Sequence, residues 1–163
     1  GLGYPGGPAV DRIAEKGNPN AFRFPRVRFE DGSFDFSFSG LKTAVINTVN
    51  QLRQKGEALP TEDICASFRQ AVVDVLTEHT IAAAIGLKVD TICLAGGVAA
   101  NSLLRDAMAS CAGKAGIRTL FPSLALCTDN AAMIACAGFY SLMAGNRADW
   151  RLNAVPSLKI GSS

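Results

Sequence analysis

The sequence is poor in histidine, with His79 as its single copy among 163 residues. A hydrolytic triad needs a histidine base beside its nucleophile, and His79 lies in a predicted helix far from any serine elbow. Zinc peptidases need two histidines on one helix face, which this sequence cannot supply. These absences exclude both kinds of hydrolytic site within this sequence, and we expect His79 to be a surface or boundary residue without a catalytic role.

Long apolar runs and a strong excess of charge are also missing. The longest apolar helical pattern, residues 131–144, is shorter than the roughly 20 residues that a membrane span needs. Lys and Arg number 16 against 14 Asp and Glu, a balance too even to indicate nucleic-acid binding by charge alone or to exclude it. The five cysteines are odd in number and widely spaced, which predicts reduced thiols. We expect a cytoplasmic protein that does not associate with membranes.

The sequence contains neither a P-loop nor the glycine fingerprint of a dinucleotide-binding fold. It does contain an apolar run at residues 89–95, followed by Gly96 and Gly97 and by Asn101 before a helical pattern. This order predicts a buried strand, a tight turn and a helix start. Adjacent glycines let a ligand approach the backbone closely, and a helix start favours negative charge. Taken alone, the turn fits ligand contact and simple chain reversal equally well.

Residues 89–144 predict the order strand, helix, strand, helix. The second strand is expected near 117–121, and capping residues at 128–130 precede an apolar helix at 131–144. Strands joined by a crossover helix are parallel neighbours, so the loops 96–101 and 127–130 should open at the same edge of the sheet. Asp129 lies in the second loop, where a carboxylate suits a nucleotide or a metal ion, although one Asp is an incomplete metal site.

The first half of the sequence predicts a short helix at 9–16, entered through a Pro-Gly-Gly-Pro loop. Gly7 and Asp11 lie one turn apart and could face one ligand, but an exposed Asp near a helix start is the interpretation that local sequence favours. Alternating aromatics at 22–38 predict a hairpin with one aromatic face. Arg23, Arg26 and Arg28 could touch phosphates, although solubility or edge protection is the commoner reason for such residues. Helices are predicted at 41–54 and 61–85.

Four motifs in this order resemble the carboxyl-terminal half of the TsaD family, formerly called glycoprotease or O-sialoglycoprotein endopeptidase. They are YPGGP at 4–8, FSFSGLKTA at 36–44, AGGVAAN at 95–101 and CTDNAAMI at 127–134. The first residue is not Met, and we expect the chain to be part of something longer. The resemblance covers nearly the whole chain and leaves the 146–163 tail without an assigned role.

The resemblance implies an α/β fold, namely one lobe of an actin-like ATPase (ASKHA, ribonuclease H-like), with a mixed sheet flanked by helices. Residues 1–163 would be the carboxyl-terminal lobe of a two-lobed protein whose amino-terminal lobe is absent. The 22–38 hairpin and helices 41–86 would form its first part, and residues 89–144 its nucleotide-binding part. The family transfers a threonylcarbamoyl group from threonylcarbamoyl-adenylate to N6 of the adenosine next to the anticodon in tRNA.

The resemblance also implies roles for particular residues. Gly7, Asp11 and Asn101 match substrate-binding positions, and Gly96 and Gly97 would form a nucleotide-contacting turn. Asp129 matches a ligand of one divalent metal ion per subunit, with iron favoured and zinc or magnesium as alternatives. The remaining ligands, a His-x-x-x-His motif, would lie outside this chain. No catalytic residue is assigned.

The implied partners are tRNA, threonylcarbamoyl-adenylate or ATP and, in bacteria, a TsaB-like paralogue and a TsaE-like ATPase. Our first hypothesis is therefore the substrate-binding lobe of a tRNA-modifying transferase, inactive as this fragment. The alternative is a non-catalytic nucleotide-binding or scaffolding module of the actin-like ATPase superfamily. A sugar or acetate kinase lobe would share the fold, but the four motifs disfavour it.

Overall fold

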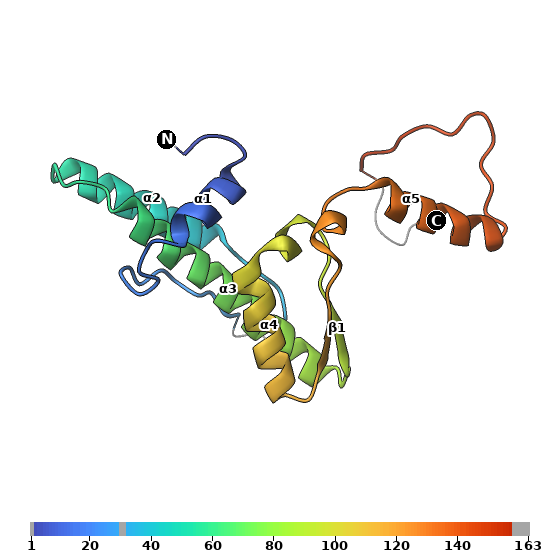
Figure 1. The fold of residues 1–163 in the computed structure, drawn as a ribbon, viewed down its shortest axis with the longest axis horizontal. Helices are drawn as coiled ribbons and strands as arrows, with labels where there is room; N and C mark the ends of the chain where they lie inside the picture. Colours follow the sequence, from blue (N-terminus) through green and yellow to red (C-terminus); the bar gives the residue numbers. More distant parts are fainter. Residues whose placement is uncertain (1, 30–31, 158–163) are drawn as a thin grey trace. The chain divides into compact units, whose positions relative to one another are not determined.

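The computed structural model describes residues 2–29 and 32–157, and the chain divides into two units, Gly1–Cys127 and Thr128–Ser163. We describe each unit by itself. The elements, in chain order, are α1 (Gly6–Ala14), α2 (Ser39–Gln54), α3 (Thr61–Gly86), β1 (Thr91–Cys93), the 3-10 helix η1 (Gly97–Ala100), α4 (Ser102–Lys114), β2 (Arg118–Leu120), the 3-10 helix η2 (Leu124–Leu126) and, in the second unit, α5 (Ala131–Met143) (Figure 1). Each predicted helix and each strand of the 89–144 pattern is confirmed, with shifted ends.

Helix α3 is the element against which the rest of the first unit packs. Its 26 residues make it roughly 39 Å long at the rise of an α-helix, and two carboxylates in its first turn, Glu62 and Asp63, favour its start. Three separate hydrophobic clusters each contain buried residues of α3. They join it to α1, to α2 with the segment near Phe24, and to β1, α4 and the start of β2. The first unit is therefore mostly helical.

The sheet consists of two parallel strands, which confirms the predicted parallel pair. Thr91 pairs with Arg118 and Cys93 with Leu120, and α4 makes the crossover between the strands. The implied mixed sheet is wrong for the described residues, because β1 and β2 are the only strands there. The extended segment expected to supply further strands makes its contacts with α3 instead.

That segment, residues 22–38, forms no strand in its described parts, 22–29 and 32–38. The predicted hairpin is therefore wrong there, and two residues of its expected turn, 30 and 31, lie outside the described residues. Phe24 is buried beside α3, and the Phe22 amide donates to Ser67 Oγ at 3.1 Å. A period of two marks extended backbone, but a ladder also needs a partner strand. Here the side chains of α3 replace that partner.

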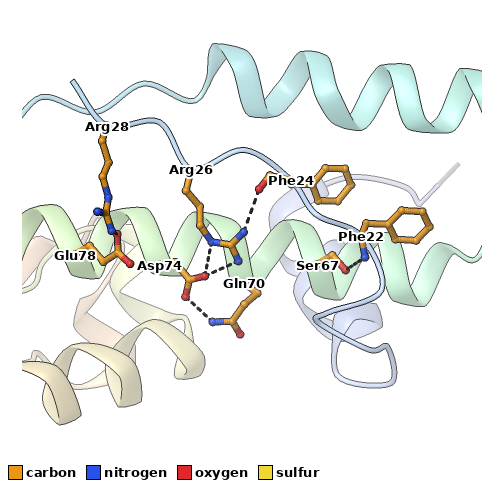
Figure 2. Close-up of polar contacts among 8 residues, drawn as sticks. All are labelled: Phe22, Phe24, Arg26, Arg28, Ser67, Gln70, Asp74 and Glu78. Atoms are coloured by element: carbon orange, nitrogen blue, oxygen red, sulfur yellow. Dashed lines mark hydrogen bonds and ion pairs between the residues drawn. The ribbon is translucent and has the colours of Figure 1, made fainter. Parts of the chain in front are cut away.

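Two arginines of this segment, Arg26 and Arg28, point to α3 as well (Figure 2). Arg26 Nη2 lies 2.6 Å from Asp74 Oδ2, and Arg28 Nη2 lies 2.5 Å from Glu78 Oε2. The Arg26 guanidinium also donates to the Phe24 carbonyl at 3.1 Å. Asp74 and Glu78 are one helical turn apart on α3, so these two arginines fasten the segment along one face of the helix.

His79 departs from its expected surface position. Its residue is 8% exposed, its Nδ1 lies 3.0 Å from the Asp35 carbonyl oxygen, and its ring stacks on Phe36 with 5.5 Å between centroids. Residues 35 and 36 cover it, so its burial depends on a segment that is distant in sequence.

Among the helices of the described ranges, none combines the length and the apolar composition that a membrane span requires.

Candidate functional site

A pocket of about 460 Å³ lies between α1, α3 and the start of α4 in the first unit. Its walls are mostly aliphatic and aromatic, and three polar side chains, Asp11, Arg69 and Asn101, belong to its lining. Gly6 and Gly7, in the first turn of α1, line it too. An apolar pocket with a few convergent polar groups is the usual form of a small-molecule site.

Asp11 holds the polar side chains together. Its Oδ1 accepts a hydrogen bond from Asn101 Nδ2 at 2.6 Å and another from Arg69 Nη1 at 3.0 Å. Arg69 Nη1 also lies within 3.2 Å of the Asp11 carbonyl oxygen, to which it donates. Hydrogen bonds with an ionised partner are stronger than neutral ones. The network therefore links α1, α3 and the start of α4 beside the pocket.

Asn101 is positioned by the start of α4. It is the N-cap residue, with extended backbone, and its Oδ1 accepts a hydrogen bond from the Leu104 amide at 2.9 Å. Asparagine is among the preferred residues at this position because its side chain satisfies an amide that the helix leaves unpaired. With its oxygen on the cap, its amide nitrogen is directed at Asp11, and one of that nitrogen's two N–H groups remains for another acceptor.

The glycines of the candidate site differ in whether the structure requires glycine at their positions. A Cβ added at Gly7 would meet nothing within 4 Å, so packing inside this chain does not demand glycine there. Gly96 has φ 84° and ψ 172°, a conformation that is essentially restricted to glycine. Gly96 thus serves chain reversal at the start of η1. Neither Gly96 nor Gly97 lines the pocket, although Val98 and Asn101 do, and their nucleotide contact stays a prediction.

Asp129 belongs to the second unit and is exposed just before α5. Asn130 caps that helix through a hydrogen bond from the Met133 amide at 3.0 Å, as the string of capping residues predicted. Within the described ranges, no group of three or more His, Cys, Asp or Glu residues is arranged to hold a metal ion. Asp129 therefore forms no such group with other residues of these ranges, and its role as a metal ligand stays a prediction.

Arg69 is the residue of this pocket that sequence reasoning missed. It neighbours Phe68 on α3, and a single arginine beside an apolar stripe is normally interpreted as a solvated side chain. Its side chain is 18% exposed. No local signal distinguishes it, because its partner Asp11 lies 58 residues earlier in the sequence.

Comparison with known proteins identifies the family. The family model of TsaD, tRNA N6-adenosine threonylcarbamoyltransferase, matches residues 1–136. The chain belongs to the TsaD family. The matched region contains all four motifs on which the resemblance was based, so the resemblance is confirmed.

Curated bacterial members of the family are similar to nearly all of this chain. Identity is 51% over 161 residues with the tRNA N6-adenosine threonylcarbamoyltransferase of Clostridium botulinum (strain 657 / Type Ba4), covering 99% of this chain and 47% of that protein. The enzyme of Desulfitobacterium hafniense (strain Y51) is 51% identical over 160 residues, covering 98% and 47%. That of Clostridium perfringens (strain 13 / Type A) is 49% identical over 161 residues, covering 99% and 48%. The chain spans about half the length of these relatives.

Proposed function

We propose that this chain is the substrate-binding lobe of a tRNA N6-adenosine threonylcarbamoyltransferase and that its pocket holds the adenylate part of threonylcarbamoyl-adenylate. One observation carries the proposal. Gly7 and Asp11, expected from the first motif and the helix after it, and Asn101, expected from the third motif, line one pocket. Asp11 and Asn101 are hydrogen-bonded at 2.6 Å although 90 residues separate them.

The proposed reaction requires orientation more than proton transfer from this lobe. The N6 amine of tRNA adenosine attacks the carbamoyl carbonyl, and AMP leaves. The aliphatic and aromatic walls of the pocket suit the adenine ring, and Asp11 and Asn101 offer polar contacts at its end. Holding the adenylate in a fixed orientation converts transfer to tRNA into an effectively intramolecular step. We assign no general base within this chain.

The proposed metal would contribute charge. Asp129 would be one ligand of a divalent ion, with iron favoured and zinc or magnesium as alternatives, and further ligands would come from outside this chain. When bound, such an ion would offset the negative charge that develops on the carbonyl and phosphate oxygens. Because the described residues complete no site, we derive no step through the metal.

The proposal extends to the whole protein. The chain would be one lobe of an actin-like ATPase fold, with residues 89–144 as its nucleotide-binding part, and the lining of the pocket supports adding α1 and α3 to that part. It would act in the cytoplasm on tRNA, with threonylcarbamoyl-adenylate or ATP as small-molecule ligand. In a bacterium its partners would be a TsaB-like paralogue and a TsaE-like ATPase.

Calorimetric titration of the 163-residue chain with ATP tests the pocket. We expect binding that Asp11→Asn weakens about tenfold or more, since a hydrogen bond to a charged group contributes about 1.5–3 kcal/mol. Asp106→Asn is the matched control, because Asp106 is exposed on α4 outside the pocket. Equal affinity of wild type and Asp11→Asn would contradict the assignment.

A transfer assay separates the enzyme from a non-catalytic module. We expect little transfer to tRNA by the 163-residue chain and restored transfer when it is joined to the amino-terminal half of a relative. In that joined protein, Asp129→Ala should abolish transfer. Intact transfer by Asp129→Ala would favour the nucleotide-binding or scaffolding module, and robust transfer by the chain alone would contradict the proposed need for a second lobe.

A further inference from the structure

Arg69 contacts Asp11 in a way that fixes the orientation of the whole residue. One nitrogen, Nη1, donates to the carboxylate oxygen Oδ1 at 3.0 Å and to the main-chain carbonyl at 3.2 Å. The torsion that orients a carboxylate is broad and only weakly restricted by itself. A donor on α3 that grips both the backbone and the side chain of Asp11 removes that freedom.

The two oxygens of the Asp11 carboxylate are used unequally. Both protein donors, Arg69 and Asn101, bind Oδ1, and Oδ2 has no hydrogen-bond partner among the described residues. The Asp11 side chain is 33% exposed, and the residue lines the pocket. An ionised carboxylate accepts about four hydrogen bonds in total. The network therefore leaves Oδ2 without a protein donor among the described residues, so that this oxygen can accept a hydrogen bond from outside the protein.

The position of Arg69 leaves one of its polar atoms without a hydrogen bond. Its Nε is buried and has no hydrogen-bond partner in the described structure, whereas buried polar atoms are paired in the large majority of cases. Asn101 is already fixed by the cap of α4. Asp11 is thus held from α3 by Arg69 and from the start of α4 by Asn101. Among the described residues, only Arg69 has hydrogen bonds to both the backbone and the carboxylate of Asp11.

We propose that Arg69 is a positioning residue that turns the Asp11 carboxylate so that Oδ2 accepts a hydrogen bond from a hydroxyl of the bound ligand. The inference rests on the proposed function, in which the ligand is an adenylate and the hydroxyls are those of its ribose. Arg69 acts through Asp11, so its contribution to binding should depend on the Asp11 carboxylate.

A double-mutant cycle tests this dependence, with ATP as the probe and calorimetric titration of the 163-residue chain as the readout. We expect Arg69→Met to weaken ATP binding about tenfold when Asp11 is intact, and less than about twofold in the Asp11→Asn background. Arg69→Lys, which keeps the charge and a donor, should restore most of the affinity. Arg26→Met is the matched control. Arg26 also forms an ion pair with an aspartate, Asp74 of α3, but it does not line the pocket.

A second probe addresses the hydroxyl directly. Wild-type protein should bind 2′,3′-dideoxy-ATP about tenfold more weakly than ATP, and Arg69→Met should bind the two about equally, since a tenfold change corresponds to the loss of one good hydrogen bond. If the losses of ATP affinity caused by Arg69→Met and Asp11→Asn simply multiply in the double variant, the two residues act independently. That result would overturn the inference and leave the proposed function standing. Absence of ATP binding by the wild type would overturn both. If Arg69→Met does not fold by circular dichroism, the same cycle with Arg69→Ala, which removes the donor and has a high helix propensity, decides.

Discussion

Gly7 offers a way to separate ligand binding from folding in this protein. It lines the pocket in the first turn of α1, and a Cβ built there would meet nothing within 4 Å. Gly7→Ala therefore adds one methyl group that meets no residue other than its chain neighbours. The following residue, Pro8, disfavours helical backbone for a residue with a Cβ, whereas alanine favours helix over glycine by up to about 1 kcal/mol. Because these two effects oppose each other, the free energy of unfolding should change by no more than about 1 kcal/mol.

The same methyl group should harm binding. If the ligand backs against the first turn of α1, the added methyl occupies space that the ligand needs. Overpacking a filled site costs about 1–3 kcal/mol, which is about 5- to 150-fold in affinity. The measurements are urea denaturation for stability and calorimetric titration with ATP for affinity.

The control for Gly7→Ala is Gly113→Ala in α4. A Cβ there also meets nothing within 4 Å, and Gly113 does not line the pocket. Gly113 is not followed by a proline, so this variant should gain up to about 1 kcal/mol of stability. It should bind ATP as the wild type does. Equal ATP affinity of Gly7→Ala and wild type would refute the placement of the ligand against α1, and a large loss of stability would refute the open space at Gly7.

Further predictions concern the folding of the first unit. Gly17→Ala should destabilise the protein strongly or prevent its folding, because the new Cβ would lie 2.0 Å from the backbone oxygen of Glu62; a melting temperature equal to that of the wild type would contradict the packing of α1 against α3. Gly96→Ala should lower the free energy of unfolding by about 1–3 kcal/mol, because its φ of 84° is strained for alanine, and urea denaturation measures the loss. Burial raises the pKa of the Cys65 thiol, so Cys65 should react with iodoacetamide more slowly than the exposed Cys93. A thiol whose pKa is higher in the folded protein than in the unfolded chain stabilises the fold at pH values below its pKa in the unfolded chain. That contribution is lost as the pH rises through its pKa in the folded protein. Stability should therefore fall at alkaline pH, less so in Cys65→Ala, and equal alkylation rates would contradict the burial.

Much of this protein is encoded locally in its sequence. Apolar periodicity placed the helices, and Asn101 and Asn130 marked the starts of α4 and α5 because a capping side chain acts on amides within one helical turn. The strand, helix, strand order settled the parallel pair of β1 and β2, since the crossover rule depends only on element order. The motifs indicated the family, and the family match confirmed it.

Other features of this protein depend on residues that are distant in the sequence, so only the tertiary structure decided them. The alternation at 22–38 encodes extended backbone, but the burial of Phe24 beside α3, with the ion pairs to Asp74 and Glu78, places the segment along a helix rather than in a hairpin. The same packing buried His79. Arg69 became part of the candidate site only because α1 packs on α3 and brings Asp11 to its guanidinium. Sequence periodicity describes one element at a time, whereas these features arise from contacts between residues that are 44 to 58 positions apart.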